Sequence, residues 1–188
     1  MARWQPNAQE RLEAAAFALF AEQGYEATTV AQIAERAGLT ERTFFRHYAD
    51  KKEVLFWGQG LLEEMLAAQA AEAQPEAAPI DVVAAAFGTM ARMIAGRGAL
   101  PIERQRVIDA TPALRERELH KMDSLARALA AALDGRGTAP RTARVAAGAG
   151  VAAFTAAYEE WIATEGTVDL EDVTRRAFAD LRDVAGGR

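Results

Sequence analysis

The sequence has no cysteine and only two histidines, His47 and His120, among its 188 residues. Without cysteine there are no disulfide bonds, thiolate nucleophiles or cysteine-ligated zinc sites. The two histidines lie far apart along the chain, which leaves little material for a metal site or for histidine-based catalysis. We therefore expect no metal, no cofactor and no enzymatic activity.

Helix-breaking residues are also scarce, with 14 glycines and 6 prolines against 45 alanines. Alanine has the highest helix propensity of all residues, so the composition predicts an all-α fold and argues against a sheet-rich one. The N-terminal segment has no apolar run of the signal-peptide type, and no stretch reaches the roughly 18 apolar residues that cross a bilayer. We expect a cytoplasmic protein that does not contact a membrane.

Neither the N-terminal third of the chain nor the remainder has an excess of basic side chains. Residues 1–56 hold 7 basic and 8 acidic side chains, and residues 57–188 hold 15 and 19. The segment from Arg36 to Lys52 is a local exception, because its five basic and two acidic side chains give a net charge of +3. Charge alone favours an ordinary solvated helical face, so DNA binding needs a second signal.

Capping residues divide the first fifty positions into three helices. Apolar spacing predicts a helix over about residues 7–23. A Thr-x-x-Gln capping box at Thr29 begins a second helix, which Gly38 ends in the left-handed conformation, and Thr40 caps a third over about residues 40–48. Two helices of about eight residues joined by a short turn are typical of a helix-turn-helix.

The third predicted helix buries one face and leaves the other outward. Its outward side chains are Thr40, Glu41, Arg42, Thr43, Arg46 and His47. Such a helix fits the DNA major groove, which is about 12 Å wide, where arginine can bond guanine O6 and N7. Threonine hydroxyls and helix N-terminal amides suit phosphate oxygens. The pattern predicts a DNA-recognition helix.

The run GYEATTVAQIAERAGLTERTFFRHYADKKEVL, residues 24–55, resembles the DNA-binding motif of the tetracycline-repressor (TetR/AcrR) family. The resemblance extends over more than thirty residues. It implies an all-helical homodimer of about nine helices. Residues 1–50 would form a three-helix DNA-binding domain, and residues 51–188 the connecting helix and an effector-binding, dimerising helical domain.

The resemblance also implies particular DNA contacts. Carried over position by position, they fall on Thr29, Glu41, Arg42, Thr43, Phe45, Arg46, His47 and Lys51. Phe45 stands where the family most often has tyrosine, and Ala31 stands where many members have a basic residue. Because those two polar contacts are missing, we expect Arg42 and Arg46 to take a larger share of the base recognition.

Beyond residue 50 the pattern predicts helices at about 51–73, 80–95, 102–109, 112–134, 140–164 and 170–184. Three of their faces gather large apolar side chains, namely Phe87, Met90 and Ile94; Met122, Leu125 and Leu129; and Phe154, Tyr158 and Trp161. Such stripes form either a dense core or the lining of a pocket for a largely apolar effector, and the sequence leaves both readings open.

The segment from Gly148 to Ala153 matches the dinucleotide pattern G-x-G-x-x-A, but no strand precedes it, so we interpret its glycines as sites of close helix approach. In the family that the chain resembles, the last two long helices form the dimer interface. The implied interface residues are Gly148, Ala152, Ala156, Val173, Phe178 and Leu181. The alternative for each residue is burial within one subunit.

These patterns together predict a ligand-responsive transcriptional regulator. We expect a repressor that binds a palindromic double-stranded operator as a homodimer and is released by a small molecule. A small helical enzyme or lipid-binding bundle is a second hypothesis, and a protein-interaction bundle is a third. The outward set of threonine, arginine, histidine and lysine and the lack of a convergent acid–base or nucleophile constellation argue against the second hypothesis. A protein-interaction bundle would not need the outward arginines.

Overall fold

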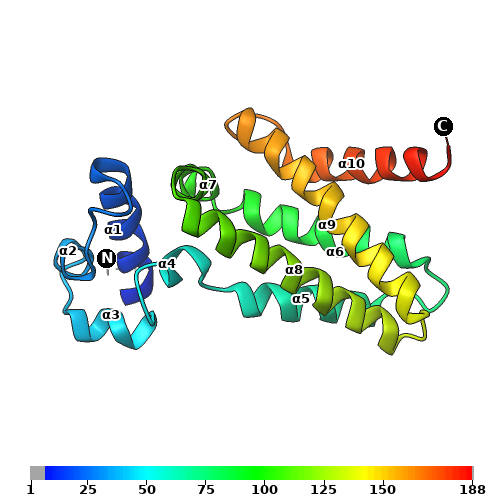
Figure 1. Ribbon diagram of the computed structural model, residues 1–188, viewed down its shortest axis with the longest axis horizontal. Helices are drawn as coiled ribbons and strands as arrows, with labels where there is room; N and C mark the ends of the chain where they lie inside the picture. The colour runs from blue at the N-terminus through cyan, green and yellow to red at the C-terminus, as the bar shows by residue number, and fades with distance from the viewer. Residues whose placement is uncertain (1–6, 188) are drawn as a thin grey trace, which may run out of the picture. The chain divides into compact units, whose positions relative to one another are not determined.

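The computed structural model describes residues 7–187, which form ten α-helices and contain no strand (Figure 1). The helices are α1 (Ala8–Gln23), α2 (Val30–Arg36), α3 (Glu41–His47), α4 (Glu53–Phe56), α5 (Gln59–Glu72), α6 (Pro79–Ala95), α7 (Leu100–Ala110), α8 (Pro112–Gly135), α9 (Pro140–Ala163) and α10 (Leu170–Ala185). The all-α fold that the composition predicts is confirmed, with an N-terminal helix-turn-helix as expected.

The chain divides into two compact units. The first contains the described residues up to Trp57 together with Glu103–Arg115, and the second contains Gly58–Ile102 and the residues from Glu116 onward. Helices α1 to α4, most of α7 and the start of α8 therefore belong to the first unit. Helices α5, α6, α9 and α10 and the rest of α8 belong to the second.

In the first unit α1, α2 and α3 pack on one another around buried side chains that include Leu12, Ile33 and Phe44. The predicted caps are confirmed. The Thr29 hydroxyl accepts from the Gln32 amide at 3.2 Å in a complete capping box, and the Thr40 hydroxyl accepts from the Thr43 amide at 3.2 Å. Short helices are marginal alone, so these caps and the shared core hold α2 and α3 in place.

The single helix expected over residues 51–73 is wrong, because the chain breaks between α4 and α5. Helix α4 begins at Glu53, and just before it Asp50 Oδ1 accepts from the Lys52 and Glu53 amides at 2.9 and 3.1 Å. At Gly58, however, φ is +84°, a left-handed conformation that glycine adopts without steric penalty. This break explains why residues 7–187 form ten helices rather than about nine.

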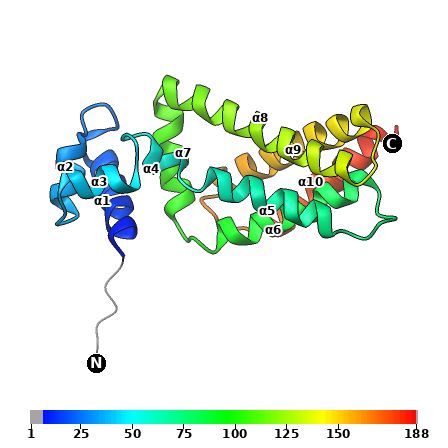
Figure 2. The same ribbon diagram turned by 90° about the horizontal axis from the view of Figure 1, so that it is seen from below.

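The second unit is built around α6, which packs against α5, α9 and α10 (Figures 1 and 2). Gly150 lets α9 come close to α6, because a Cβ at this position would lie 2.2 Å from Val83 Cγ1. The rings of Phe87 and Phe154 stack beside it with centroids 4.9 Å apart. The interpretation of this glycine as a site of close helix approach is confirmed.

Within residues 7–187 no single helix is both long and apolar enough to cross a membrane, although α6 and α7 pass that test together as a bent pair. The same part of the chain contains no group of three or more His, Cys, Asp or Glu side chains that could hold a metal ion.

Candidate nucleic-acid interface

Helix α3 has one buried and one exposed face. Phe44 and, just after the helix, Tyr48 are buried against the first unit, whereas Arg42, Phe45 and Arg46 are exposed. Phe45 and Arg46 lie three and four positions after Arg42, so all three side chains occupy the same side of the helix. The outward face that the sequence predicts is therefore the face that solvent reaches.

Five of the predicted DNA-contact residues come together on this surface. Thr40, Arg42, Thr43, Phe45 and Arg46 line one shallow hollow along α3. Two guanidinium groups, two hydroxyls and one exposed aromatic ring are thereby placed side by side. This combination supplies donors for base edges and phosphates together with an apolar contact surface.

The threonines of this region also have structural tasks. The Thr40 and Thr43 hydroxyls lie 3.0 Å apart, and the Thr40 hydroxyl caps α3. The Thr29 hydroxyl caps α2 and lies 3.2 Å from Gln32 Oε1. These caps order the first turns of both helices. Backbone amides at a helix N-terminus are groups that can bind a phosphate.

His47 lies at the end of the same helix and is only partly exposed. Its ring packs at an angle to that of Tyr48, with centroids 6.4 Å apart. Its Nε2 atom is buried and has no hydrogen-bond partner within the described residues. The phosphate contact that the resemblance implies for His47 stays a prediction.

Lys51 is held by the turn between α1 and α2. Its Nζ donates to the carbonyl oxygens of Tyr25 at 2.6 Å and Thr28 at 2.8 Å, and it lies 4.1 Å from the centre of the Tyr25 ring. Burial lowers the pKa of Lys51, and burial together with Asp50 and Glu26 raises the pKa of Tyr25 to about 12. Lys51 thus ties the start of α4 to the turn that precedes α2.

Sequence reasoning missed this role, because Lys51 and its acceptors are more than twenty positions apart and no spacing rule connects them. It also missed Arg11, whose Nη2 donates to the carbonyls of Ala37 and Gly38 at the turn between α2 and α3. Both side chains donate to backbone carbonyls that flank the helix-turn-helix. Both therefore stabilise the shape of the turn that positions α3.

The basic segment is less positive than its composition suggests. Arg36 pairs with Glu22 of α1 through two hydrogen bonds of 2.8 and 2.6 Å. The pair lowers the pKa of Glu22 and raises that of Arg36. The cationic groups exposed on α3 itself are Arg42 and Arg46, so the positive field is concentrated on that helix.

The nine predicted ligand-contact residues converge in the second unit. Phe87, Met90, Leu125, Leu129, Phe154 and Trp161 are buried in one apolar cluster, and Ile94, Met122 and Tyr158 pack against it. The Tyr158 hydroxyl donates to the carbonyl oxygen of Pro101 at 3.2 Å. The three helical faces meet as expected, and both readings, core and pocket lining, remain compatible with this arrangement.

The six predicted interface residues separate into two groups. Gly148, Ala152 and Ala156 form an exposed stripe on α9, and Leu181 is partly exposed. Val173 and Phe178 are only 1% exposed, and the Phe178 ring lies 6.1 Å from that of Phe87. Val173 and Phe178 therefore follow the alternative interpretation, burial within one subunit, because their side chains fill the core of their own subunit.

A helix-turn-helix with an exposed arginine-bearing third helix, followed by an all-helical second unit, defines the class of helix-turn-helix regulators. Comparison with known families is more specific. Residues 12–56 match the family "Bacterial regulatory proteins, tetR family", and residues 77–186 match the "MftR C-terminal domain". The chain belongs to the tetR family of bacterial regulatory proteins.

A curated relative agrees with this assignment. The HTH-type transcriptional regulator TcmR of Streptomyces glaucescens is 36% identical over 121 residues, which are 58% of this chain and 51% of that protein. The chain thus spans about half the length of the curated relative it matches.

Solved structures share the fold at low identity. FadR of Bacillus halodurans has a TM-score of 0.65 at 15% identity, covering 95% of this chain and 96% of that one. The SmeT–triclosan complex has a TM-score of 0.68 at 18% identity, covering 96% and 91%. FadR of Bacillus subtilis in complex with stearoyl-CoA has a TM-score of 0.61 at 21% identity, covering 92% and 96%.

Proposed function

We propose that this chain is a ligand-responsive transcriptional repressor that binds a palindromic operator as a homodimer in the cytoplasm. The observation that carries the proposal is the exposed face of α3, where Thr40, Arg42, Thr43, Phe45 and Arg46 gather on one surface. In a homodimer two such helices would enter successive major grooves about 34–36 Å apart, which requires a two-fold symmetric site. No catalytic step is part of the proposal.

A largely apolar effector fits the second unit best. Aromatic and methionine side chains from three helices converge there, and Tyr158 adds a hydroxyl at the edge of the cluster. Pockets of this composition bind apolar ligands and orient them with few polar groups. The complexes of related folds with triclosan and stearoyl-CoA support an effector of this kind.

Helix α7 offers a route from effector to DNA. Pro101, near its start, accepts the hydrogen bond from Tyr158 in the second unit. One turn later, Arg104 Nε donates to the Leu55 carbonyl of α4 at 2.6 Å, and its guanidinium lies 5.0 Å from the centre of the Phe56 ring. A ligand that displaces Tyr158 would act on α7, and through Arg104 on the end of the DNA-binding unit.

Such a ligand can release DNA only to the extent that it binds the released state more tightly than the DNA-bound state. We expect Tyr158→Phe to keep operator affinity and to weaken the response to the effector. Loss of operator affinity in this variant would contradict the route through α7.

The decisive experiment is selection of DNA ligands from random duplexes by the purified protein at about 150 mM salt, followed by sequencing and a salt titration of the affinity. We expect an enriched two-fold symmetric motif. Arg46→Ala should weaken binding by about 1–3 kcal/mol and relax the sequence preference at one position of each half-site. Arg127→Ala, an exposed arginine of α8 paired with Asp123, is the matched control.

An absence of enrichment, with only weak and salt-sensitive binding, would refute the proposal. That result would instead favour the second hypothesis, a helical enzyme or lipid-binding bundle that uses the second unit alone.

A further inference from the structure

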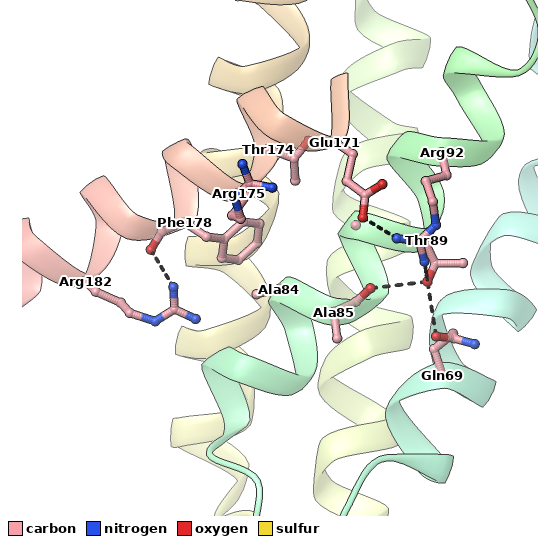
Figure 3. Close-up of a pocket in the computed structure, with 11 residues that line it drawn as sticks. Gln69, Ala84, Ala85, Thr89, Arg92, Glu171, Thr174, Arg175, Phe178 and Arg182 are labelled. Carbon is pink, nitrogen blue, oxygen red and sulfur yellow. Dashed lines mark hydrogen bonds and ion pairs between the residues drawn. The ribbon is translucent and has the colours of Figure 1, made fainter. Parts of the chain in front are cut away.

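A hollow of about 420 Å³ lies on the second unit along α6, between α5 and α10 (Figure 3). Its α6 side is made of Ala84, Ala85 and Gly88, and Phe178 of α10 flanks them. Because these α6 side chains are short, the helix surface recedes between its neighbours. A Cβ at Gly88 would meet no atom within 4 Å, so the floor is both apolar and open.

The rim of the hollow is polar and rich in arginine. Its charged lining residues are Arg92, Arg175, Arg182 and Glu171. Glu171 pairs with Arg92 (Figure 3). The acidic partners of the other two arginines, Asp172 at 2.8 Å and Asp81 at 2.6 Å, lie outside the lining. The three ion pairs balance the charge of the rim, but each guanidinium has five N–H donors, so the arginines keep donors that suit an anionic group in the hollow.

One hydroxyl of the lining is unsatisfied. Thr174 is 1% exposed, and its Oγ1 has no hydrogen-bond partner within the described residues. The other threonine of the hollow, Thr89, differs, because its hydroxyl accepts from Arg92 at 3.0 Å and lies 3.3 Å from Gln69 Oε1. A buried hydroxyl without a partner lowers stability, so such a group in a native protein calls for an explanation.

Rotation about the Cα–Cβ bond of Thr174 exchanges its methyl and hydroxyl groups, and threonine populates two rotamers in helices. In the second rotamer the Thr174 hydroxyl could therefore donate a hydrogen bond to a ligand in the hollow. Thr174 and Arg175 are neighbours on α10 and both line the hollow, so one acidic group could accept from both.

We propose that this hollow binds a small aromatic carboxylate. Its flat apolar body lies over Ala84, Ala85 and Gly88, and its carboxylate accepts hydrogen bonds from the Thr174 hydroxyl and the Arg175 guanidinium. A charge-assisted pair of this kind is stronger than neutral hydrogen bonds. The site differs from the apolar cluster around Phe154 and does not depend on DNA binding.

The test uses isothermal titration of the full chain with 2-naphthoate as the probe and its uncharged amide as the comparison. We expect saturable binding of naphthoate, with the amide bound about tenfold more weakly, the loss expected when one charge-assisted contact is removed. Arg175→Gln should also weaken naphthoate binding about tenfold. Arg176→Gln should bind like the wild type, because Arg176 donates to Glu160 at 3.0 Å and does not line the hollow.

Two further variants separate a binding role from a structural one. Thr174→Val keeps the shape of the side chain but removes the hydroxyl, so it should raise the thermal midpoint of the free protein while weakening naphthoate binding. Gly88→Leu should fill the hollow and abolish binding with the fold intact, because the space above Gly88 is open.

Naphthoate binding that is absent, or that is unchanged in Thr174→Val and Gly88→Leu, would overturn the proposal. So would a lower thermal midpoint of Thr174→Val, since that result would give the hydroxyl a structural partner. Selection of operator DNA measures the proposed regulatory function separately, so the two proposals can fail independently.

Discussion

At the scale of single residues, Phe45 is the most unusual side chain of the exposed α3 face that we propose binds DNA. It is 55% exposed, and it stands on α3 between Arg42 and Arg46. A phenylalanine ring can neither donate to nor accept from a phosphate, but it can contact the methyl group of thymine in the major groove. We therefore expect Phe45 to read thymine.

Replacing the contacted thymine by uracil removes one methyl group, so the wild-type affinity should fall by about 0.8 kcal/mol, or about fourfold. Phe45→Ala should bind the thymine and uracil duplexes equally. Affinities measured by fluorescence anisotropy check this, with Arg46→Ala as a control that keeps the discrimination. Discrimination that persists in Phe45→Ala would exclude the contact.

Lys51 is the second residue whose contacts suggest an experiment. Lys51→Met removes the side-chain donor of the Thr28 carbonyl and one of the two donors to the Tyr25 carbonyl, which also accepts from the Thr28 amide. The opening free energy of the first unit should therefore fall by about 1–3 kcal/mol. Hydrogen exchange of the amides in residues 25–36 measures the loss directly.

The neighbouring Lys52 provides the control for this measurement. It is exposed and pairs with Asp50 at 3.2 Å. Because exposed ion pairs contribute little, Lys52→Met should change the exchange by about 0.5 kcal/mol or less. Equal effects of the two substitutions would show that Lys51 has no special structural role.

At the scale of helices, the contact of α9 with α6 depends on Gly150. A methyl group there would collide with Val83 Cγ1 at 2.2 Å, so Gly150→Ala should destabilise the protein by about 1–3 kcal/mol through overpacking. Gly88→Ala, on the opposing helix, places its methyl in open space and should stabilise by about 0.5–1 kcal/mol. Urea unfolding measures the free energy of unfolding of both variants. An unchanged free energy in Gly150→Ala would show that α9 and α6 can move apart with little loss of stability.

The carboxylate of Glu63 on α5 interacts with Gln59 of the same helix and with Ser124 of α8. Gln59 Nε2 donates to Glu63 Oε1 at 2.8 Å, and the hydrogen bonds from Gln59 and Ser124 lower the pKa of Glu63. A carboxyl whose pKa is lower in the folded state stabilises the fold when ionised, so this contribution is present above its unfolded value, near 4.5, and is lost as the pH falls through the folded value.

Glu63→Gln should therefore be less stable than the wild type at pH 7, and the difference should disappear in acid. Thermal unfolding between pH 3 and pH 7 measures the difference, with the exposed neighbour Glu64→Gln as the control. A difference that does not depend on pH would show that the charge of Glu63 makes no contribution.

At the scale of the whole molecule, the exposed small residues of α9 suggest how two copies would associate. Gly148, Ala152 and Ala156 present little side-chain bulk, so a second copy could approach the helix closely. Ala152→Glu places a charge in the middle of this stripe. It should convert the dimer to a monomer of 20.3 kDa and weaken operator binding, because one subunit contacts a single half-site.

Light scattering coupled to gel filtration measures the mass. Ala131→Glu, which adds the same charge at an exposed position of α8, is the control and should leave the dimer intact. A dimer that persists in Ala152→Glu would place the interface elsewhere.

Sequence signals that act over a few neighbouring residues were the most reliable predictors of where helices begin. The capping residues Thr29 and Thr40 mark the helix starts that the structure shows, since a cap acts on backbone amides within three positions of itself. The break at Gly58 was missed, because a glycine within an otherwise helical pattern does not by itself determine whether the chain adopts a positive φ.

Site residues follow the same distinction. The outward face of α3 was predictable, because the 3.6-residue period assigns Phe44 to the core and Arg42 and Arg46 to the surface. Which apolar residues of α10 face a partner was not predictable. Phe178 and Leu181 look alike in a periodic pattern, and only the position of α6 beside α10 buries Phe178.

By itself the sequence determined the helical fold, the order of the helices and the recognition face of α3, because propensity, capping and periodicity are properties of neighbouring residues. The tertiary structure alone decided that Lys51 and Arg11 support the helix-turn-helix, that Arg104 contacts α4, and that Thr174 lacks a partner beside a hollow. These features join residues far apart along the chain, and their contacts exist only once the helices have packed.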